Sequence, residues 1–178
     1  MKLQEYNSDN AEKIKQLFTG VFTDSEGQSE GILIGDLVDK LMRETDEQDL
    51  YGFVAIDHEK IIGCIFFSRL TFECNVNAFM LAPVAIHTSF QGKGNGQKLI
   101  NYGVSSLKDK GVELVITYGD PRFYSKVGFQ TLSVNVIQPP LALSMPIGWL
   151  GQSLTGNPIP TIKERPRCVK AFNDPVYW

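Results

Sequence analysis

Two stretches near the N-terminus place apolar residues at the three- and four-residue spacing of amphipathic helices. The first begins after a D-x-x-E capping box formed by Asp9 and Glu12, and the second ends near Arg43. The polar, glycine-containing residues 23–29 are predicted to form the loop between them, and residues 2–6 a short edge strand before them. The apolar positions are Ile14, Leu17, Phe18, Val21 and Phe22 in the first helix, and Ile34, Leu37, Val38 and Leu41 in the second.

The middle of the chain changes to segments rich in β-branched and aromatic residues. Residues 50–56 and 61–70 are predicted strands, and the polar residues 57–60 between them predict a hairpin. A third strand is predicted over Ala78–Ile86. This strand contains Pro83, which cannot donate a hydrogen bond to a neighbouring strand and therefore marks an edge, a bulge or a splay.

A helix and a further strand follow. Residues 95–110 have the apolar periodicity of a helix, which Gly111 is predicted to end in a left-handed conformation. Leu114–Tyr118 is nearly all apolar or β-branched, which is typical of a buried parallel strand. Together with Ala78–Ile86, these segments predict a βαβ unit, whose crossover is normally right-handed.

The C-terminal part of the chain has a less regular pattern. Asp120 is a predicted N-cap, Pro121 the first residue of a helix of about two turns, and Gly128 its end. Residues 134–137 are a candidate strand. Residues 155–178 are rich in proline, yet they contain too many aromatic residues for a disordered tail. We therefore expect this tail to pack on the domain.

Length and composition favour one soluble globular domain over residues 1–178. The formal net charge of −3 does not favour general binding to nucleic acid. The three cysteines, Cys64, Cys74 and Cys168, have no paired spacing and are predicted to be reduced thiols of a cytoplasmic protein. The sequence predicts no signal peptide, and no apolar run reaches the ~18 residues of a membrane span. Its two histidines do not lie at metal-ligand spacing with a cysteine, so no metal is expected.

The stretch Gln91-Gly92-Lys93-Gly94-Asn95-Gly96 lies between the third strand and the helix of the βαβ unit. Glycines at the start of a helix leave backbone N–H groups available to an anion, and the helix dipole favours negative charge there. Lys93 adds a positive charge. The P-loop pattern fails because the chain has His87 and Gly94 where it needs glycine and Ser or Thr. The dinucleotide fingerprint fails at Gln97.

The stretch Val84-Ala85-Ile86-His87-Thr88-Ser89-Phe90-Gln91-Gly92-Lys93-Gly94-Asn95-Gly96 resembles the strand and Q/R-x-x-G-x-G/A loop of the GNAT superfamily of N-acetyltransferases. A second stretch, Gly119-Asp120-Pro121-Arg122-Phe123-Tyr124-Ser125-Lys126-Val127-Gly128-Phe129, resembles the Y-x-x-x-G-F segment of that family. The resemblance covers residues 1–129. It is greatest to bacterial members with Gly-Asp-Pro before the tyrosine and a C-terminal extension, here residues 130–178.

The resemblance implies an α/β (α+β) fold with a mixed, mostly antiparallel sheet. The sheet would have a central βαβ unit, helices on both faces, and a splay between its fourth and fifth strands. It also implies a single acetyltransferase domain over residues 1–178, in which residues 130–178 supply a strand and an extension packed on the core of residues 1–129. A homodimer is compatible with this family.

The family resemblance assigns acetyl-CoA as the cosubstrate, with no metal. The pantetheine arm would pair with the backbone of Val84, Ala85 and Ile86. The pyrophosphate would be held by the loop residues Gln91, Gly92, Lys93, Gly94, Asn95 and Gly96. Tyr124 matches the family's tyrosine and is the candidate general acid that protonates the departing thiolate, since a phenol with a pKa near ~10 holds its proton at neutral pH.

The general base and the acceptor are less defined. The carboxylate that many family members have on the fourth strand is replaced by apolar residues here. This leaves Glu73, His87, Asp120, a water relay or an amine that arrives neutral as alternatives. The acceptor is expected to be a small-molecule or peptide amine, and residues 155–178 are candidates to line its groove. Two other functions fit the glycine loop: a non-catalytic CoA-binding sensor or interaction module, and a structural domain that binds an anion.

Overall fold

The computed structural model describes the whole chain, Met1–Trp178. Its strands follow the order β1-β2-β3-β4-β5-β7-β6 in one mixed sheet, and β4 and β5 are parallel. The described pairings β1–β2, β5–β7 and β6–β7 are antiparallel. The predicted fold class, a mostly antiparallel mixed sheet with a central βαβ unit, is therefore confirmed. None of the helices is both long enough and apolar enough to cross a membrane.

The chain divides into two compact units. The first contains Met1–Phe67 and Pro83–Gly103, and the second contains Ser68–Ala82 and Val104–Trp178. Strands β3 and β4 and helix α3 contribute residues to both. The elements of the chain are β1 (Lys2–Glu5), α1 (Ala11–Glu26), α2 (Gln28–Glu44), β2 (Leu50–Asp57), β3 (Lys60–Leu70), β4 (Ala78–Ile86), α3 (Asn95–Asp109), β5 (Leu114–Tyr118), α4 (Pro121–Tyr124), β6 (Gln130–Thr131) and β7 (Trp149–Ser153).

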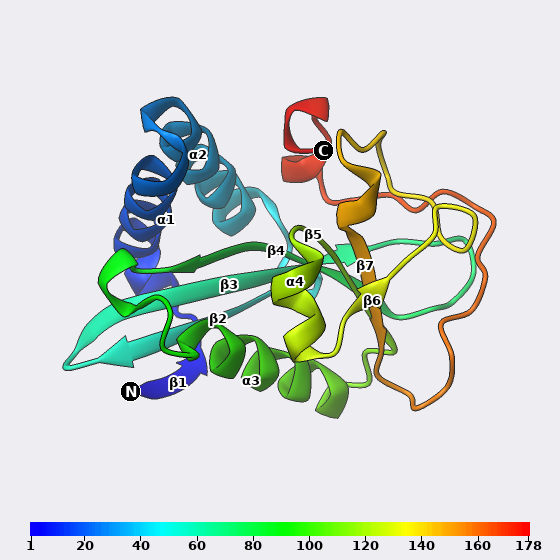
Figure 1. Cartoon of the computed structure of the whole chain (residues 1–178), viewed down its shortest axis with the longest axis horizontal. Coiled ribbons are helices and arrows are strands. Elements are labelled where there is room, and N and C mark those ends of the chain that lie inside the picture. The colour runs from blue at the N-terminus through cyan, green and yellow to red at the C-terminus, as the bar shows by residue number, and fades with distance from the viewer. The chain divides into compact units, whose positions relative to one another are not determined.

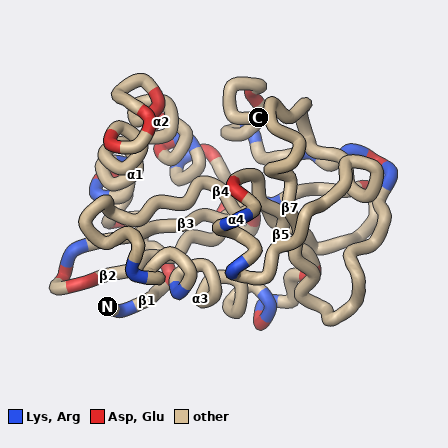
Figure 2. Tube along the Cα trace, viewed as in Figure 1, with Lys and Arg blue, Asp and Glu red and all other residues tan.

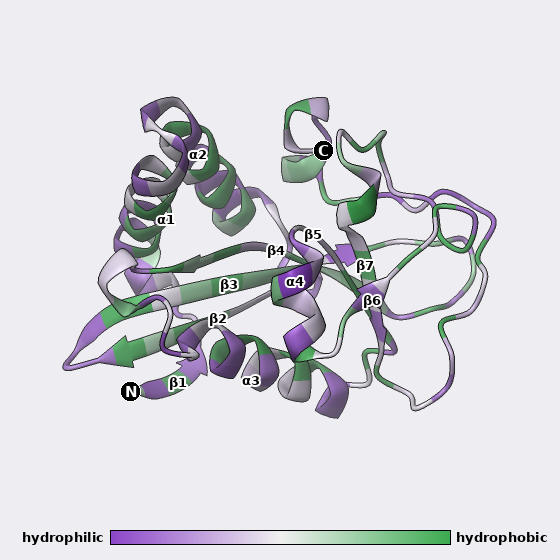
Figure 3. Cartoon of the chain, viewed as in Figure 1, coloured by the Kyte–Doolittle hydropathy of each residue, from purple (hydrophilic) through white to green (hydrophobic).

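In the first unit, α1 and α2 form a helical hairpin (Figure 1). Their apolar stripes, coloured green in Figure 3, contribute Ile14, Phe18 and Val38 to the core, and the ring of Phe18 stacks on Phe66 of β3. The outer surfaces of both helices carry interspersed acidic and basic residues (Figure 2).

Residues 23–29, predicted as a loop, are instead almost entirely helical. Helix α1 continues through Glu26, and only Gly27, with φ of 100°, separates it from α2. The two helices lie so close that a Cβ on Gly31 or Gly35 would collide with Thr23 or Thr19 of α1. This tertiary packing overrides the loop preference of the polar residues. Glycine is needed at residue 27 for its conformation and in α2 for space.

The predicted capping box is also wrong. Asp9 does not cap α1; instead the side chain of Asn7 accepts a hydrogen bond from the backbone N–H of Asp9 and starts a short 3₁₀ helix. The β2–β3 hairpin is confirmed, but its turn contains only His58 and Glu59. Both residues have positive φ, at 43° and 64°, as a tight primed turn requires.

In the second unit, β5 lies between β4 and β7. Its parallel register with β4 runs from Ala78↔Leu114 to Leu81↔Thr117 and stops there, two residues before Pro83. Pro83 lacks the N–H that would extend this pairing, so the sequence prediction of a splay between β4 and β5 is confirmed. Antiparallel β7 pairs with β5 along its whole length.

The strand predicted at residues 134–137 is absent. Residue Ile137 forms only an isolated bridge to Ile162, and the C-terminal strands are β6 and β7 instead. The final tail contains only short 3₁₀ turns but is well packed at its end: Trp178 lies 6.2 Å from the ring of Trp149 and donates a hydrogen bond to the carbonyl of Phe172. Aromatic contacts at its end and two isolated bridges, Thr71–Arg167 and Ile137–Ile162, therefore hold this segment in place of a regular strand.

Candidate active site

The loop that follows β4 has a conformation that only glycine adopts easily. Gly92 and Gly94 have φ of 70° and 76°, and neither has an atom within 4 Å of the position that a Cβ would take. Glycine is therefore required here for backbone conformation rather than for space inside the protein. The open side of both residues leaves the loop accessible to a ligand.

The backbone N–H groups of Gly92 to Gly96 in this loop have no hydrogen-bond partner within the protein. Among the described hydrogen bonds, none is donated by the backbone of Gly92 to Gly96, and the first helical bond of α3 runs from Lys98 N to Gly94 O at 3.1 Å. These groups lie at the positive end of the 15-residue helix α3. Such an array can bind a phosphate-type anion.

Side chains of the loop fix its shape by bonding to nearby carbonyls. The amide of Gln91 donates to the carbonyl of Ile86 at 2.9 Å, and the amide of Asn95 donates to the carbonyl of Phe90 at 2.9 Å. Lys93 donates to the carbonyl of Ser89 at 3.0 Å and lies 5.5 Å from the ring centroid of Phe90. The predicted loop residues thus form one structured element, with the lysine folded back on it.

The end of β4 leads directly into this loop. Ala85 and Ile86 are buried, whereas Val84 is partly exposed. His87, the next residue, donates its backbone N–H to the carbonyl of Ile62 on β3 at 2.8 Å. No described pairing joins Val84 to Ile86 with β5, because the register of β4 and β5 ends at Leu81. This edge of β4 can therefore pair with an extended ligand.

In the second unit, Tyr124 lies at the C-terminal end of α4 and packs edge-on against Phe123 and Phe129. A Cβ on Gly119 would approach its ring to 2.6 Å, so the glycine after β5 makes room for the aromatic side chain. Burial raises the pKa of Tyr124, and a hydrogen bond to Thr117 opposes that rise. The phenol therefore keeps its proton at neutral pH.

Thr117 was not predicted from the sequence as a site residue. Its hydroxyl donates to the carbonyl of Leu81 at 2.8 Å, where the pairing of β4 and β5 ends. The Thr117 hydroxyl therefore links the carbonyl of Leu81, to which it donates, with the phenol of Tyr124. The available sequence signal was a polar residue inside an otherwise apolar strand, where it is fully buried.

The candidate bases have different surroundings. Asp120 accepts from the backbone N–H of Arg122 at 2.9 Å and forms an ion pair with its guanidinium, and these hydrogen bonds lower the pKa of Asp120. The Nδ1 of His87 accepts from the backbone N–H of Ser89 at 3.3 Å, which caps a 3₁₀ turn. Glu73 is exposed. Asp120 and His87 therefore have structural roles, and Asp120 is a weak base.

Cavities elsewhere in the chain do not contain the predicted site residues. A pocket of about 450 Å³ in the second unit is lined by residues of the C-terminal segment, such as Pro139 and Arg165. Another, of about 500 Å³ in the first unit, lies around Tyr6 and Thr45. No cluster of three or more His, Cys, Asp and Glu side chains could hold a metal ion.

The parallel pair of β4 and β5 ends early, and a glycine loop joins β4 to helix α3, as the resemblance to the GNAT superfamily implies. Residues 48–131 match the sequence model of the acetyltransferase (GNAT) domain. The chain is also 30% identical over 139 residues to YjhQ, an uncharacterized N-acetyltransferase of Escherichia coli strain K12, and the match covers 75% of this chain and 76% of YjhQ. The chain therefore belongs to the GNAT family of N-acetyltransferases.

Two solved structures resemble the fold over nearly its whole length. The GNAT family N-acetyltransferase YhbS from Escherichia coli in complex with CoA has a TM-score of 0.84 at 23% identity, covering 97% of this chain and 92% of that one. A GNAT family acetyltransferase from Brucella melitensis in complex with acetyl-CoA has a TM-score of 0.76 at 21% identity, covering 97% of each chain. At these identities the likeness concerns the fold.

Proposed function

We propose that this protein is an acetyl-CoA-dependent N-acetyltransferase, in which the amine of a small molecule or peptide attacks the thioester directly in a ternary complex. Membership of the GNAT family supports the reaction class. The CoA and acetyl-CoA complexes of the two neighbours with similar folds support the choice of donor. Holding donor and acceptor together supplies much of the rate of such a reaction.

The observation that carries this proposal is the set of unpaired backbone N–H groups from Gly92 to Gly96 at the start of α3. We assign them to the pyrophosphate of the coenzyme, whose negative charge the N-terminus of the helix favours. The ammonium of Lys93 is near enough to this loop to add long-range attraction. The side chains of Gln91 and Asn95 then hold the loop in shape rather than touch the phosphates.

The edge of β4 is the proposed partner of the pantetheine arm. Backbone groups of Val84, Ala85 and Ile86 lie beyond the last pair of the β4–β5 register and are open to an extended ligand. The backbone N–H of Val84 or Ala85 is the proposed donor to the oxyanion that forms when the amine attacks. A donor fixed in a strand needs no reorganisation during the reaction.

Tyr124 is the proposed general acid. The carbon–sulfur bond breaks as the amide forms, and the phenol gives its proton to the departing thiolate sulfur. Its raised pKa keeps the proton in place before this step. Thr117 is a proposed positioning residue, because it holds the phenol at the end of the β4–β5 pairing. The amine nitrogen loses its proton to water or to Glu73, since Asp120 and His87 are engaged in capping.

The proposed acceptor is an amine. The acidic residues Glu26, Glu30 and Glu73 would attract a cationic one, and the C-terminal segment is proposed to contribute to its selection. Two neighbours with the same fold are aminoglycoside 6'-acetyltransferases, which acetylate amines of aminoglycosides, but at 14% and 17% identity they indicate fold rather than substrate. No metal takes part in the proposed reaction, and acetyl-CoA is its cosubstrate.

Calorimetry with acetyl-CoA tests the proposal through a matched pair of variants. Gly94→Ala should weaken binding about fivefold, because alanine favours other loop conformations and the bound one then costs about 1 kcal/mol more. Gly156→Ala is the control, since Gly156 also has a positive φ, 81°, and open space around it. We expect its affinity to equal that of the wild type.

Thiol release with a panel of amines then separates an enzyme from a binding module. An enzyme releases CoA faster with at least one amine than with water. Tight binding without release for any amine would favour a non-catalytic sensor. A folded protein that ignores the coenzyme would reject the proposed function altogether.

A further inference from the structure

A second binding site is suggested by the pocket of about 450 Å³ in the C-terminal part of the second unit. It lies wholly within residues 134–165, outside the region that matches the acetyltransferase domain. Two segments form it, and they are joined by the bridge between Ile137 and Ile162 and by the hydrogen bond from Ile162 N to Val136 O at 2.8 Å. The buried indole of Trp149 also donates to the carbonyl of Ile137 at 3.0 Å. The pocket is therefore preformed.

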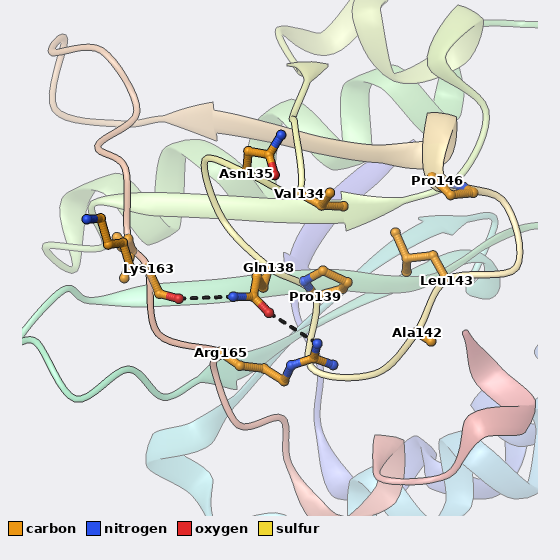
Figure 4. Close-up of a pocket in the computed structure, with 10 residues that line it drawn as sticks. Val134, Asn135, Gln138, Pro139, Ala142, Leu143, Pro146, Lys163 and Arg165 are labelled. Carbon is orange, nitrogen blue, oxygen red and sulfur yellow. Dashed lines mark hydrogen bonds between the residues drawn. The ribbon is translucent and has the colours of Figure 1, made fainter.

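One wall of the pocket is apolar. Val134, Pro139, Leu143 and Pro146 are among its lining residues, and Figure 4 shows them around the central space. A volume of this size lies in the range of small-molecule sites, which combine apolar walls with a few polar groups. The wall suits an apolar ligand body rather than a sugar or a bare phosphate.

A single guanidinium supplies the polar end. Arg165 donates to the side-chain oxygen of Gln138 at 3.1 Å and to the carbonyl of Pro140 at 3.4 Å, and Gln138 in turn donates to the carbonyl of Lys163 at 3.0 Å. Figure 4 shows the guanidinium directed toward the side chain of Gln138. Two of its donors bond to neutral acceptors, so the others are available to a ligand.

The guanidinium of Arg165 has no carboxylate partner, since the adjacent Glu164 accepts from the backbone N–H of Cys74 instead. No Asp or Glu lines the pocket, and neither Arg165 nor Lys163 takes part in an ion pair. The side chain of Lys163 points away from Gln138 and Arg165 (Figure 4), so Arg165 is the cation that faces the ligand. In a protein with a net charge of −3, this is a local site that favours an anion.

We propose that this pocket binds a small monocarboxylate with an apolar body, whose carboxylate pairs with Arg165 and whose body lies against Pro139, Leu143 and Pro146. The planar fork of a guanidinium matches the two oxygens of a carboxylate. One guanidinium balances one negative charge, so a monoanion fits better than a phosphate dianion. The Gln138 bond holds the fork in position before the ligand arrives.

Phenylacetate is a suitable probe, with the neutral amide phenylacetamide as its uncharged counterpart. Titration would be followed by calorimetry with the coenzyme loop saturated by CoA, so that the two anion sites are not confused. We expect phenylacetate to bind saturably and at least about tenfold more tightly than phenylacetamide, because only the acid forms the charge-assisted pair.

Arg165→Gln should weaken phenylacetate at least about tenfold, and Arg165→Lys should weaken it less, because lysine keeps the charge without the fork. Arg167→Gln is the matched control. Arg167 is an exposed arginine two residues away that does not line the pocket, and its backbone pairs with Thr71. Equal binding of acid and amide, wild-type affinity in the Arg165→Gln variant, or no saturable binding would each overturn the proposal.

Discussion

The glycine loop after β4 and the C-terminal segment are built on different physical principles. The loop is exposed and depends on two positive-φ glycines and on short bonds from Gln91 and Asn95 to nearby carbonyls. The C-terminal segment depends instead on buried aromatic rings, with Trp149 packed against Trp178. Changes in the loop should therefore alter ligand binding with little effect on stability, and changes in the aromatic cluster should do the reverse.

Trp149→Ala is expected to have the largest effect and to test the stability side of this comparison. Trp149 is fully buried and its indole N–H bonds to the carbonyl of Ile137. Removing it creates a cavity and leaves that carbonyl unpaired, so the free energy of unfolding should fall by about 3–5 kcal/mol. Urea denaturation followed by far-UV circular dichroism measures this change.

Ile147→Ala is the control for that measurement. Ile147 is a large apolar residue of the adjacent loop but is 65% exposed, so its truncation should change stability by less than about 0.5 kcal/mol. The aromatic cluster would lose its proposed role if the two variants had similar stabilities. Loss of coenzyme affinity in folded Ile147→Ala would contradict the separation of ligand binding in the loop from stability in the C-terminal segment.

Tyr124→Phe is expected to have the next largest effect, and it tests the chemical step while the shape of the side chain is kept. The ring and its contacts with Phe123 and Phe129 remain, while the acidic proton is lost. We expect kcat to fall at least about a hundredfold, equivalent to about 2.7 kcal/mol in the activation free energy. The affinity for acetyl-CoA, measured by calorimetry, should stay within about twofold. Tyr102→Phe, on the exposed part of α3, should leave both quantities unchanged.

The pH dependence of kcat sharpens the same test. Burial raises the pKa of Tyr124 above its ordinary value of 10.0. The phenol therefore keeps its proton below pH ~10, and its acid function is lost only as the pH rises through the raised folded pKa. Any stabilisation of the folded state by this raised pKa is likewise complete below pH ~10 and is lost as the pH rises through the folded pKa. An alkaline limb near neutrality that Tyr124→Phe abolishes would contradict this account.

The same contrast explains how far the sequence could predict the structure. The bounds of β4 and β5, the N-cap at Asp120 and the glycine loop follow from local signals, namely Pro83, β-branched runs and glycines, and the structure agrees with them. The fold class and the parting of β4 from β5 could be predicted from the resemblance to the GNAT family, with Pro83 as a compatible local signal. Whether the loop residues and Tyr124 have their proposed roles stays a prediction.

What the sequence could not show depends on contacts between distant residues. The helical extension of α1 through Glu26 is stabilised by close packing on Gly31 and Gly35, and β7 pairs with β5 across more than thirty residues of chain. The role of Thr117 needs the carbonyl of Leu81 beside it. Such pairings have no local signature, so periodicity alone places a loop at residues 23–29 and a strand at residues 134–137.

Asp120→Asn is expected to have the smallest effect and separates a structural carboxylate from a catalytic one. Asparagine caps helices about as well as aspartate, so the hydrogen bond to the backbone N–H of Arg122 should persist. The ion pair with Arg122 is lost, but it is fully exposed and contributes little. If Asp120 only caps α4, kcat should change by less than about twofold at any pH. A fall in kcat approaching that of Tyr124→Phe, in a variant with wild-type stability and coenzyme affinity, would instead identify Asp120 as the base.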